Sequence, residues 1–377
     1  MEGAAHGPAD TLKNVSTRVR VPALPDRSSR RALLTSAVIA VALSATACSP
    51  DGEGPEPPGL SADGRDVTFE GGGFTVEGSF THPESPNGEP VPGALIISGS
   101  GPTNRNGNSD GRPEADTNLN LSRVLAGAGV ASLRYDKFGS GDPDTWDEKT
   151  IEAMGEDIDP LLFDAQMAAA YEELIAQPEV DPERTLIVGH SEGALFALRA
   201  REVLEDADPA LVLAAPPGAR MLDVIDRQIT EQVRTAEAQG AVNESDASTL
   251  LSDIRTARAL VRAGDELDMY DPTGIFAPQN QDFLAWIDAF DPVDLARDLP
   301  DDTPVLVLWG EEDAQIPRDE IDRLMTGFDD AERVDLPGAD HVLREYDDSP
   351  GAAALDGDRP FSPDVAPALE RFVDGLW

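Results

Sequence analysis

Ser191 stands in the sequence Gly-His-Ser-Glu-Gly, a serine held between two glycines at residues 189–193. It follows the short apolar run 185–188, and the segment 192–204 beyond it has the apolar spacing of a helix. A serine on such a strand-to-helix turn exposes its hydroxyl as a nucleophile, and side chains in place of the glycines would strike the neighbouring backbone. Because Gly-x-Ser-x-Gly also occurs by chance, the alternative of an ordinary turn serine stands until the other parts of the same chemistry are found.

A nucleophilic serine needs a histidine base, and the histidine needs a carboxylate that fixes its tautomer. Of the four histidines, only His341 in the loop PGADHVL follows all of the predicted strands, as a Ser, Asp, His order along the chain requires. Asp313 is the expected acid, because it comes directly after the apolar run 305–308, at the edge where ligands gather in open α/β sheets. Glu312 is the alternative acid, and an ordinary loop histidine is the alternative interpretation of His341.

Acyl transfer also requires two N–H donors for the oxyanion. One is expected from Glu192, directly after the serine, where the N-terminus of the predicted helix adds partial positive charge. The other is expected from Ser100, in the glycine-rich loop SGSGPTNRNGN that follows the apolar run 94–97. An ordinary surface connection is the alternative for this loop, whereas no Gly-Lys-Ser/Thr follows it to make a phosphate-binding loop.

The elements that must position these residues are predicted from short apolar runs. Such runs are typical of strands buried on both faces of a parallel sheet, and they lie at 94–97, 130–133, 185–188, 211–213 and 305–308. Segments with helical apolar spacing alternate with them, at 118–128, 157–176, 192–204 and 319–328. The alternation predicts an α/β fold with a mostly parallel central sheet flanked by helices.

Two further segments complete the predicted catalytic domain, which extends over residues 66–377. Residues 66–82 alternate as an antiparallel hairpin does, with glycines at the turn. Residues 217–290 separate two strands that a short connection would join, and they predict a mostly helical cap insertion. Apolar cap residues either line the substrate pocket or pack the cap's own helices, and the candidates are Leu222, Ile225, Ile229, Phe276, Phe283 and Trp286.

The composition indicates a globular chain with an acidic surface. Of 377 residues 40% are hydrophobic, and the formal net charge is -43. Such a surface repels phosphate backbones, so nucleic acid is excluded as a partner and a small-molecule substrate is expected. No histidine pair has metal-ligand spacing, so neither a metal nor a cofactor is expected; weak calcium binding at the acidic runs 142–147 and 298–302 is the alternative. Nothing in the sequence indicates an oligomeric state.

The first 47 residues predict an export signal of the twin-arginine and lipoprotein type. Arg30 and Arg31 precede the uncharged stretch 32–47, which is shorter than the roughly 20 residues of a spanning helix. Small residues then precede Cys48, the only cysteine, which predicts lipidation there; an incidental thiol after ordinary cleavage is the alternative. Residues 48–65 read as a flexible Pro/Gly/acidic tether. The expected location is the cell envelope, with a lipid anchor on the outer face of the cytoplasmic membrane, or secretion.

The motifs together resemble a known family. The chain contains GHSEG, SGSGPTNRNGN, RYDKFGSG at 134–141, AAPPGAR at 214–220, the pair Glu231-Gln232, WGEEDAQIP and LPGADHVL. This set resembles the α/β-hydrolase superfamily, and within it the exported bacterial esterases grouped near the serine aminopeptidase-like hydrolases. The resemblance runs from about residue 66 to the C-terminus and implies an α/β-hydrolase fold.

By this resemblance Ser191 is the nucleophile, Asp313 the acid and His341 the base, in agreement with the assignment from the residues themselves. The implied activity is hydrolysis of small carboxylic esters through an acyl-enzyme. Aminopeptidase-like or thioester hydrolysis is the alternative, and a non-catalytic ligand-binding lipoprotein is a minor one. Phe138 departs from the family pattern, and so does Asp340, whose negative charge beside the base predicts that Asp340→Asn shifts the pH-rate profile to lower pH.

Overall fold

The computed structural model describes most of the predicted catalytic domain. It covers residues 64–84, 88–109, 113–157, 159–204, 207–267, 273–349 and 356–377. The expected export signal, Cys48 and nearly all of the tether lie outside these residues. Within the described ranges, no helix combines the length and the apolar character needed to cross a membrane.

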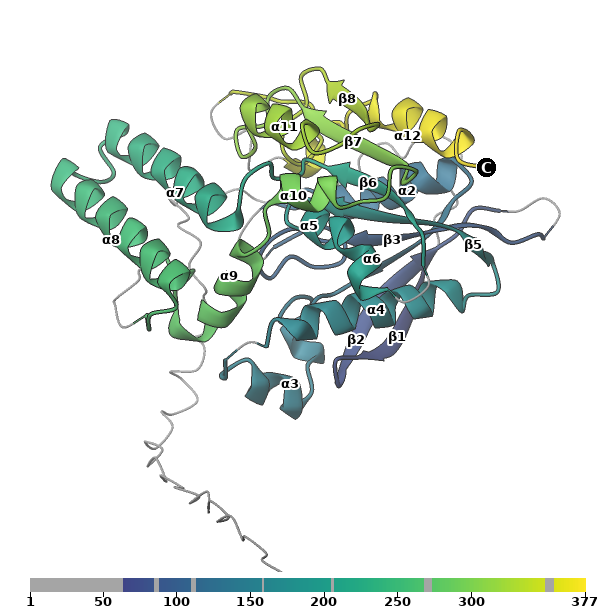
Figure 1. Cartoon of the computed structure of the whole chain (residues 1–377), viewed down its shortest axis with the longest axis horizontal. Coiled ribbons are helices and arrows are strands. Elements are labelled where there is room, and N and C mark those ends of the chain that lie inside the picture. The colour runs from purple at the N-terminus through teal and green to yellow at the C-terminus, as the bar shows by residue number, and fades with distance from the viewer. Residues whose placement is uncertain are drawn as a thin grey trace, which may run out of the picture.

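A single sheet forms the centre of the described chain (Figure 1). Its order is β1-β2-β4-β3-β5-β6-β7-β8, with antiparallel pairs only at β1–β2 and β2–β4. The strands are β1 (Arg65–Gly71), β2 (Phe74–Thr81), β3 (Val91–Ile97), β4 (Ala131–Tyr135), β5 (Val180–His190), β6 (Ala210–Ala214), β7 (Val305–Gly310) and β8 (Glu332–Leu336). The predicted hairpin and mostly parallel sheet are confirmed.

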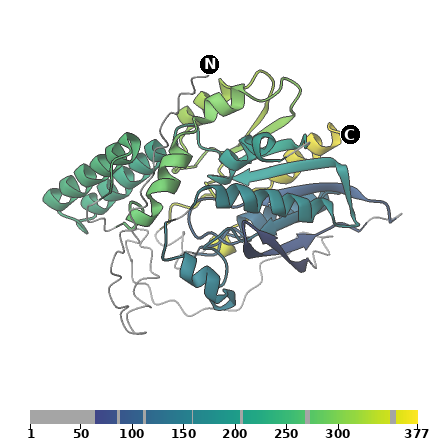
Figure 2. The ribbon, with the colours of Figure 1, turned by 60° about the horizontal axis from the view of Figure 1, so that its bottom comes forward.

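Helices cover both faces of this sheet, and Figure 2 shows the layers from a second side. On one face lie α2 (Thr117–Gly127) and α12 (Val365–Asp374), packed on alternate strand residues such as Ala94 and Ile96. On the other face Leu95 and Ile97 contribute to a second apolar core. The helices that contribute to that core include α4 (Leu161–Ile175), α5 (Gly193–Leu198), α10 (Pro292–Arg297) and α11 (Arg318–Met325). Burial of both faces explains the short apolar runs of the central strands.

The helix predicted at 192–204 is wrong in one respect, because it breaks at Arg199 into α5 and α6 (Ala200–Val203). The Arg199 guanidinium donates to both carboxylate oxygens of Asp164 at 2.9 Å. It also lies over the rings of Trp286 and Phe290, at 4.6 and 4.1 Å from their centroids. These contacts come from distant parts of the chain, so helical spacing alone gave no sign of the break.

Other boundaries also differ from the predictions. The helix expected from residue 157 begins only at Leu161, and α3 (Glu148–Ala153) and the turn η1 (Pro143–Thr145) precede it. Strand β8 and helix α12 were not among the predicted elements. Strand β8, with the sequence ERVDL, is largely half-exposed at the edge of the sheet, so it lacks the continuous apolar run of a central strand.

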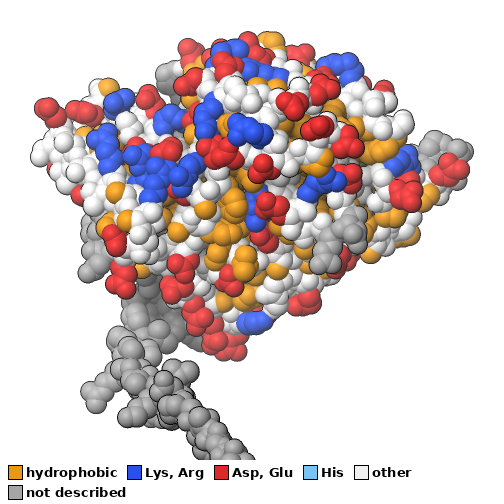
Figure 3. All heavy atoms as spheres, in the orientation of Figure 1, with side chains coloured by type: hydrophobic (Ala, Val, Ile, Leu, Met, Phe, Trp, Pro, Cys, Tyr) orange, Lys and Arg blue, Asp and Glu red, His pale blue; other side chains and the backbone are white. Residues whose placement is uncertain are grey.

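The connection between β6 and β7 contains a helical pair that projects from the sheet. The pair is α7 (Met221–Ala238) and α8 (Glu244–Ala263), and the turn η2 (Pro278–Asn280) and helix α9 (Gln281–Asp288) follow it. Helices α7 and α8 pack side by side at the left of Figure 1 and share an apolar core with α9. The buried carboxylate of Asp288 accepts from Arg220 and Arg262 at the base of this pair. Figure 3 shows arginines gathered among carboxylates over α7 and α8.

Candidate active site

Ser191 lies on a strained turn between β5 and α5. Its φ of 54° is in the left-handed region, which a non-glycine residue rarely adopts. A Cβ at Gly189 would lie 2.3 Å from the carbonyl oxygen of Gly193, and a Cβ at Gly193 would lie 2.3 Å from that of Ile97. Both glycines are therefore sterically required. The Ser191 N–H donates to the Ala214 carbonyl at 2.9 Å, which extends the β5–β6 pairing into the turn.

Asp313 and His341 lie together although 28 residues separate them in sequence. His341 Nδ1 is 2.8 Å from Asp313 Oδ2, and the two residues are only 8% and 5% exposed. The other carboxylate oxygen of Asp313, Oδ1, accepts hydrogen bonds from the N–H groups of Gln315 and Ile316 at 2.7 and 2.8 Å. The carboxylate is thus held in one orientation and requires Nδ1 of His341 to carry a proton. Glu312, the alternative acid, is exposed.

His190 joins the turn of Ser191 to the loop that carries His341. Its Nε2 lies 3.0 Å from the His341 carbonyl oxygen, and the two imidazole rings are 5.1 Å apart. Since a carbonyl only accepts, Nε2 of His190 is the protonated nitrogen. Burial lowers the pKa of His190 to about 4, and the neighbouring His341 adds to the effect, so this ring is neutral at neutral pH. Sequence analysis missed this linking role, because position 190 carries no constraint in the Gly-x-Ser-x-Gly pattern.

The two predicted oxyanion donors come from segments next to Ser191. A Cβ at Gly99 would be 3.2 Å from the Ser191 Cβ, so the loop that contains Ser100 packs directly against the serine. Glu192 follows the serine directly and is the N-cap residue of α5. Within the described part of the chain, the backbone N–H groups of Ser100 and Glu192 donate no hydrogen bond, so both are available to a ligand.

No hydrogen bond joins the Ser191 hydroxyl to His341 in the described structure. The contact between His190 and the His341 carbonyl brings the Ser191 turn next to the loop of His341. Nε2 of His341 has no acceptor or donor among the described residues. Nucleophile and base contacts in unliganded hydrolases are commonly loose and tighten when substrate binds.

Asp340, whose charge the sequence placed beside the base, is compensated. Its Oδ2 lies 2.7 Å from Arg359 Nη2, and its Oδ1 accepts the N–H groups of Val342 and Arg344 at 3.1 Å each. The carboxylate therefore holds the turn that carries His341. We expect Asp340→Asn to act mainly through this turn.

The six cap residues proposed to line a pocket divide into two groups. Leu222, Ile229 and Phe276 are at most 4% exposed within the cap's own core, so they do not face a substrate. Ile225, Phe283 and Trp286 are partly buried and also pack against the main core. The Phe283 and Trp286 rings lie 5.0 and 5.8 Å from those of Phe163 and Phe196, respectively. Because Phe196 belongs to α5, this aromatic contact brings α9 of the cap next to the helix that follows Ser191.

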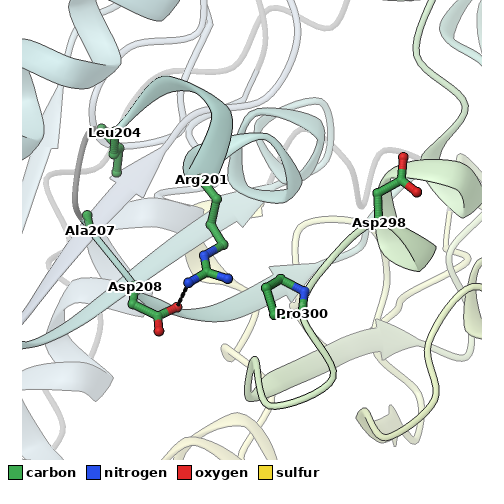
Figure 4. A pocket seen from close by; sticks show the side chains of 6 residues that line it. All are labelled: Arg201, Leu204, Ala207, Asp208, Asp298 and Pro300. Atoms are coloured by element: carbon green, nitrogen blue, oxygen red, sulfur yellow. Dashed lines mark ion pairs between the residues drawn. The ribbon is translucent and has the colours of Figure 1, made fainter.

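An open groove of about 560 Å³ lies at the opposite end of the sheet (Figure 4). Its lining residues come before β6 and β7 in the sequence, whereas Ser191 follows the carboxyl end of β5. Its lining residues are Arg201, Leu204, Ala207, Asp208, Asp298 and Pro300. Arg201 is ion-paired with Asp208 at 2.6 Å, and the groove has no part in the site described above. The described ranges also contain no group of three or more His, Cys, Asp or Glu residues arranged to hold a metal ion.

Comparison with known proteins places this geometry in a family. The model of the alpha/beta hydrolase family matches residues 107–355. No curated protein matches the chain in sequence. Among solved structures, an esterase of Pyrococcus furiosus is 14% identical with a TM-score of 0.50, covering 86% of this chain and 97% of its own. Est1E from Butyrivibrio proteoclasticus is 17% identical with a TM-score of 0.46, covering 82% and 98%.

At these identities the structural likeness is one of fold. The family match carries more weight, because it includes β4 to β8, the turn of Ser191 and the loops of Asp313 and His341. It spans well over half of the chain, and the sheet order and the strained serine turn agree with it. The chain belongs to the alpha/beta hydrolase family.

Proposed function

We propose that this protein is a serine hydrolase that cleaves carboxylic esters of small molecules through an acyl-enzyme. The observation that carries the proposal is the arrangement around Ser191. A buried Asp313–His341 pair is tied through His190 to the turn that carries the serine, and the backbone N–H groups of Ser100 and Glu192 donate no hydrogen bond within the described part of the chain. Each part matches a requirement of acyl transfer, and the family membership supports a hydrolase.

In the first step the Ser191 oxygen attacks the ester carbonyl carbon and its proton passes to Nε2 of His341. Asp313 holds the protonated Nδ1 and stabilises the imidazolium that forms. The tetrahedral oxyanion accepts hydrogen bonds from the backbone N–H groups of Ser100 and Glu192. When the carbon–oxygen bond to the alcohol breaks, the alcohol leaves with the proton from His341, and the acyl group remains on Ser191.

In the second step a water molecule replaces the alcohol. His341 takes a proton from the water, which attacks the acyl carbon, and the same two N–H groups stabilise the second oxyanion. Ser191 recovers its proton from His341 as the carboxylic acid is released. We propose that Ile225, Phe283 and Trp286 contribute the cap side of the substrate site, since they are the partly buried members of the six candidates.

The test is hydrolysis of a p-nitrophenyl ester series, from acetate to palmitate, by the protein and its Ser191→Ala variant. Loss of the nucleophile is expected to lower kcat by on the order of 10⁴-fold or more, because the other groups of the triad act only through it. Ser245→Ala, at an exposed position on α8, is the matched control and should retain full activity. A fluorophosphonate probe should label the wild-type protein and the control, but not Ser191→Ala.

Other outcomes would redirect the proposal. Labelling of Ser191 together with turnover of aminoacyl arylamides or thioesters, and not of esters, would favour the alternative hydrolase activities. A folded protein that neither labels nor turns over any of these substrates would support a ligand-binding role and overturn the proposal.

A further inference from the structure

Lys137 lies buried between the two segments that carry the expected oxyanion donors. Its Nζ donates to the carbonyl oxygen of Gly99 at 2.7 Å and lies 3.1 Å from Glu192 Oε1. The side chains of Lys137 and Glu192 are each only 5% exposed. Lys137 itself comes from a third segment, directly after β4. One ammonium group therefore connects the glycine-rich loop, the nucleophile turn and the β4 loop.

The bond to Gly99 acts on the first donor through a single peptide group. The carbonyl of Gly99 and the N–H of Ser100 belong to the same planar amide, in which the two groups point in opposite directions. A cation fixed on the carbonyl oxygen therefore aims the N–H away from itself. It also draws electron density toward the oxygen, which makes the N–H a stronger donor.

The next peptide group, between Ser100 and Gly101, is fixed as well. Thr103 Oγ1 donates to the Ser100 carbonyl oxygen at 2.8 Å, so both carbonyls that flank the Ser100 N–H have partners. The close approach of Gly99 to the Ser191 Cβ leaves this loop little room to move. Lys137 thus sets the direction of the Ser100 N–H relative to the nucleophile.

The ion pair with Glu192 links the second donor to the same ammonium. Glu192 supplies its backbone N–H to the expected oxyanion site, while its side chain pairs with Lys137. The two donors, which are far apart in sequence, are therefore held at one spacing by a buried charge pair. A buried ion pair costs desolvation that an apolar pair of similar size would avoid, so stability alone is a weak explanation for it.

From these contacts we propose that Lys137 is a positioning residue of the oxyanion site, which orients and polarises the Ser100 N–H and ties it to Glu192. The proposal rests on the proposed function, because it concerns the same oxyanion. Lys137 does not touch the substrate. Its effect is expected in the chemical step, where charge develops on the oxyanion, and not in substrate binding.

The experiment compares Lys137→Met with the wild-type protein in ester hydrolysis and in the rate of fluorophosphonate labelling. We expect kcat to fall by on the order of 10²-fold with KM changed less than about threefold, as when one oxyanion donor is disturbed. The labelling rate should fall in parallel, because the phosphonyl oxygen occupies the same site while fluoride leaves. Lys137→Arg keeps the positive charge and should recover part of kcat.

Two further variants separate positioning from folding. Lys149→Met is the matched control, because Lys149 also donates to a backbone carbonyl, that of Gly73, and lies over the ring of Phe74, but outside the site. It should retain full activity. The double variant Lys137→Met/Glu192→Met leaves no unpaired buried charge, so it keeps the test valid if the single variant is unstable.

A folded Lys137→Met protein with unchanged kcat would overturn the role of Lys137 and leave the proposed function intact. A merely structural role predicts that the melting temperature falls while kcat per folded molecule stays constant, and this result would also overturn it. A wild-type protein without ester turnover or labelling would instead refute the proposed function, and the inference with it.

Discussion

Asp313→Asn tests the proposed base through its tautomer. In the wild-type protein Asp313 Oδ1 accepts two backbone N–H groups, from Gln315 and Ile316, and Oδ2 faces Nδ1 of His341. An asparagine in the same place keeps its oxygen on the two N–H donors, so its NH₂ group faces His341. Nδ1 must then accept, the proton moves to Nε2, and the imidazole is unable to take a proton from Ser191.

The size of the effect follows from the two backbone bonds. To restore the active tautomer, the amide must flip and set its NH₂ group against both N–H groups. Leaving a buried donor unpaired costs about 1–3 kcal/mol, so the flip costs about 4 kcal/mol in all. At about 1.4 kcal/mol per tenfold, the active fraction falls to about 10⁻³. We therefore expect kcat to drop by on the order of 10³-fold or more, with KM little changed.

The assay is ester turnover at neutral pH, with Glu312→Gln as the matched control. Glu312 is the neighbouring carboxylate and is exposed, so its variant should retain activity within about twofold. Circular dichroism should show both variants folded. A fall of less than tenfold in Asp313→Asn would refute the tautomer argument, and a larger loss in Glu312→Gln would move the acid to that residue.

Three other substitutions probe the surroundings. Gly193→Ala sets a Cβ 2.3 Å from the Ile97 carbonyl oxygen, so denaturant unfolding should show a loss of about 3 kcal/mol or more. The control is Gly240→Ala, where the Cβ meets open space and the loss should be only about 1 kcal/mol. Burial lowers the pKa of His190 in the folded protein to about 4, below the value of about 6.5 in the unfolded chain. The free energy of unfolding is therefore highest above about pH 6.5, and about 3 kcal/mol of it is lost as the pH falls to 4. His190→Gln should flatten that pH dependence of the unfolding free energy, and an unchanged slope would contradict it. Asp288→Asn removes the buried carboxylate between two arginines and should cost about 3 kcal/mol, measured by calorimetry; a loss below 1 kcal/mol would show that the arginines find other partners.

The fold class and the order of the elements that carry the site could be predicted from the sequence. Apolar runs were enough to find the central strands, because strands of a parallel sheet that are buried on both faces consist mostly of apolar residues. The same runs placed Ser191 and Asp313 directly after buried strands. The need for glycine at positions 189 and 193 was predicted from the shape of the turn. The 2.3 Å approaches at both positions give the steric reason.

Which carboxylate faces His341 depends on how the chain packs in three dimensions. Glu312 and Asp313 are adjacent in sequence, and the turn after β7 buries one and exposes the other. The break at Arg199 and the link from His190 to the base loop also depend on contacts between distant segments. So does the pairing of Lys137 with Glu192 and Gly99, which unites three loops. Periodicity along the chain predicts which face of a helix or strand is buried. The partner of a buried polar group depends instead on how the elements pack, so the spacing of residues in the sequence does not predict that partner.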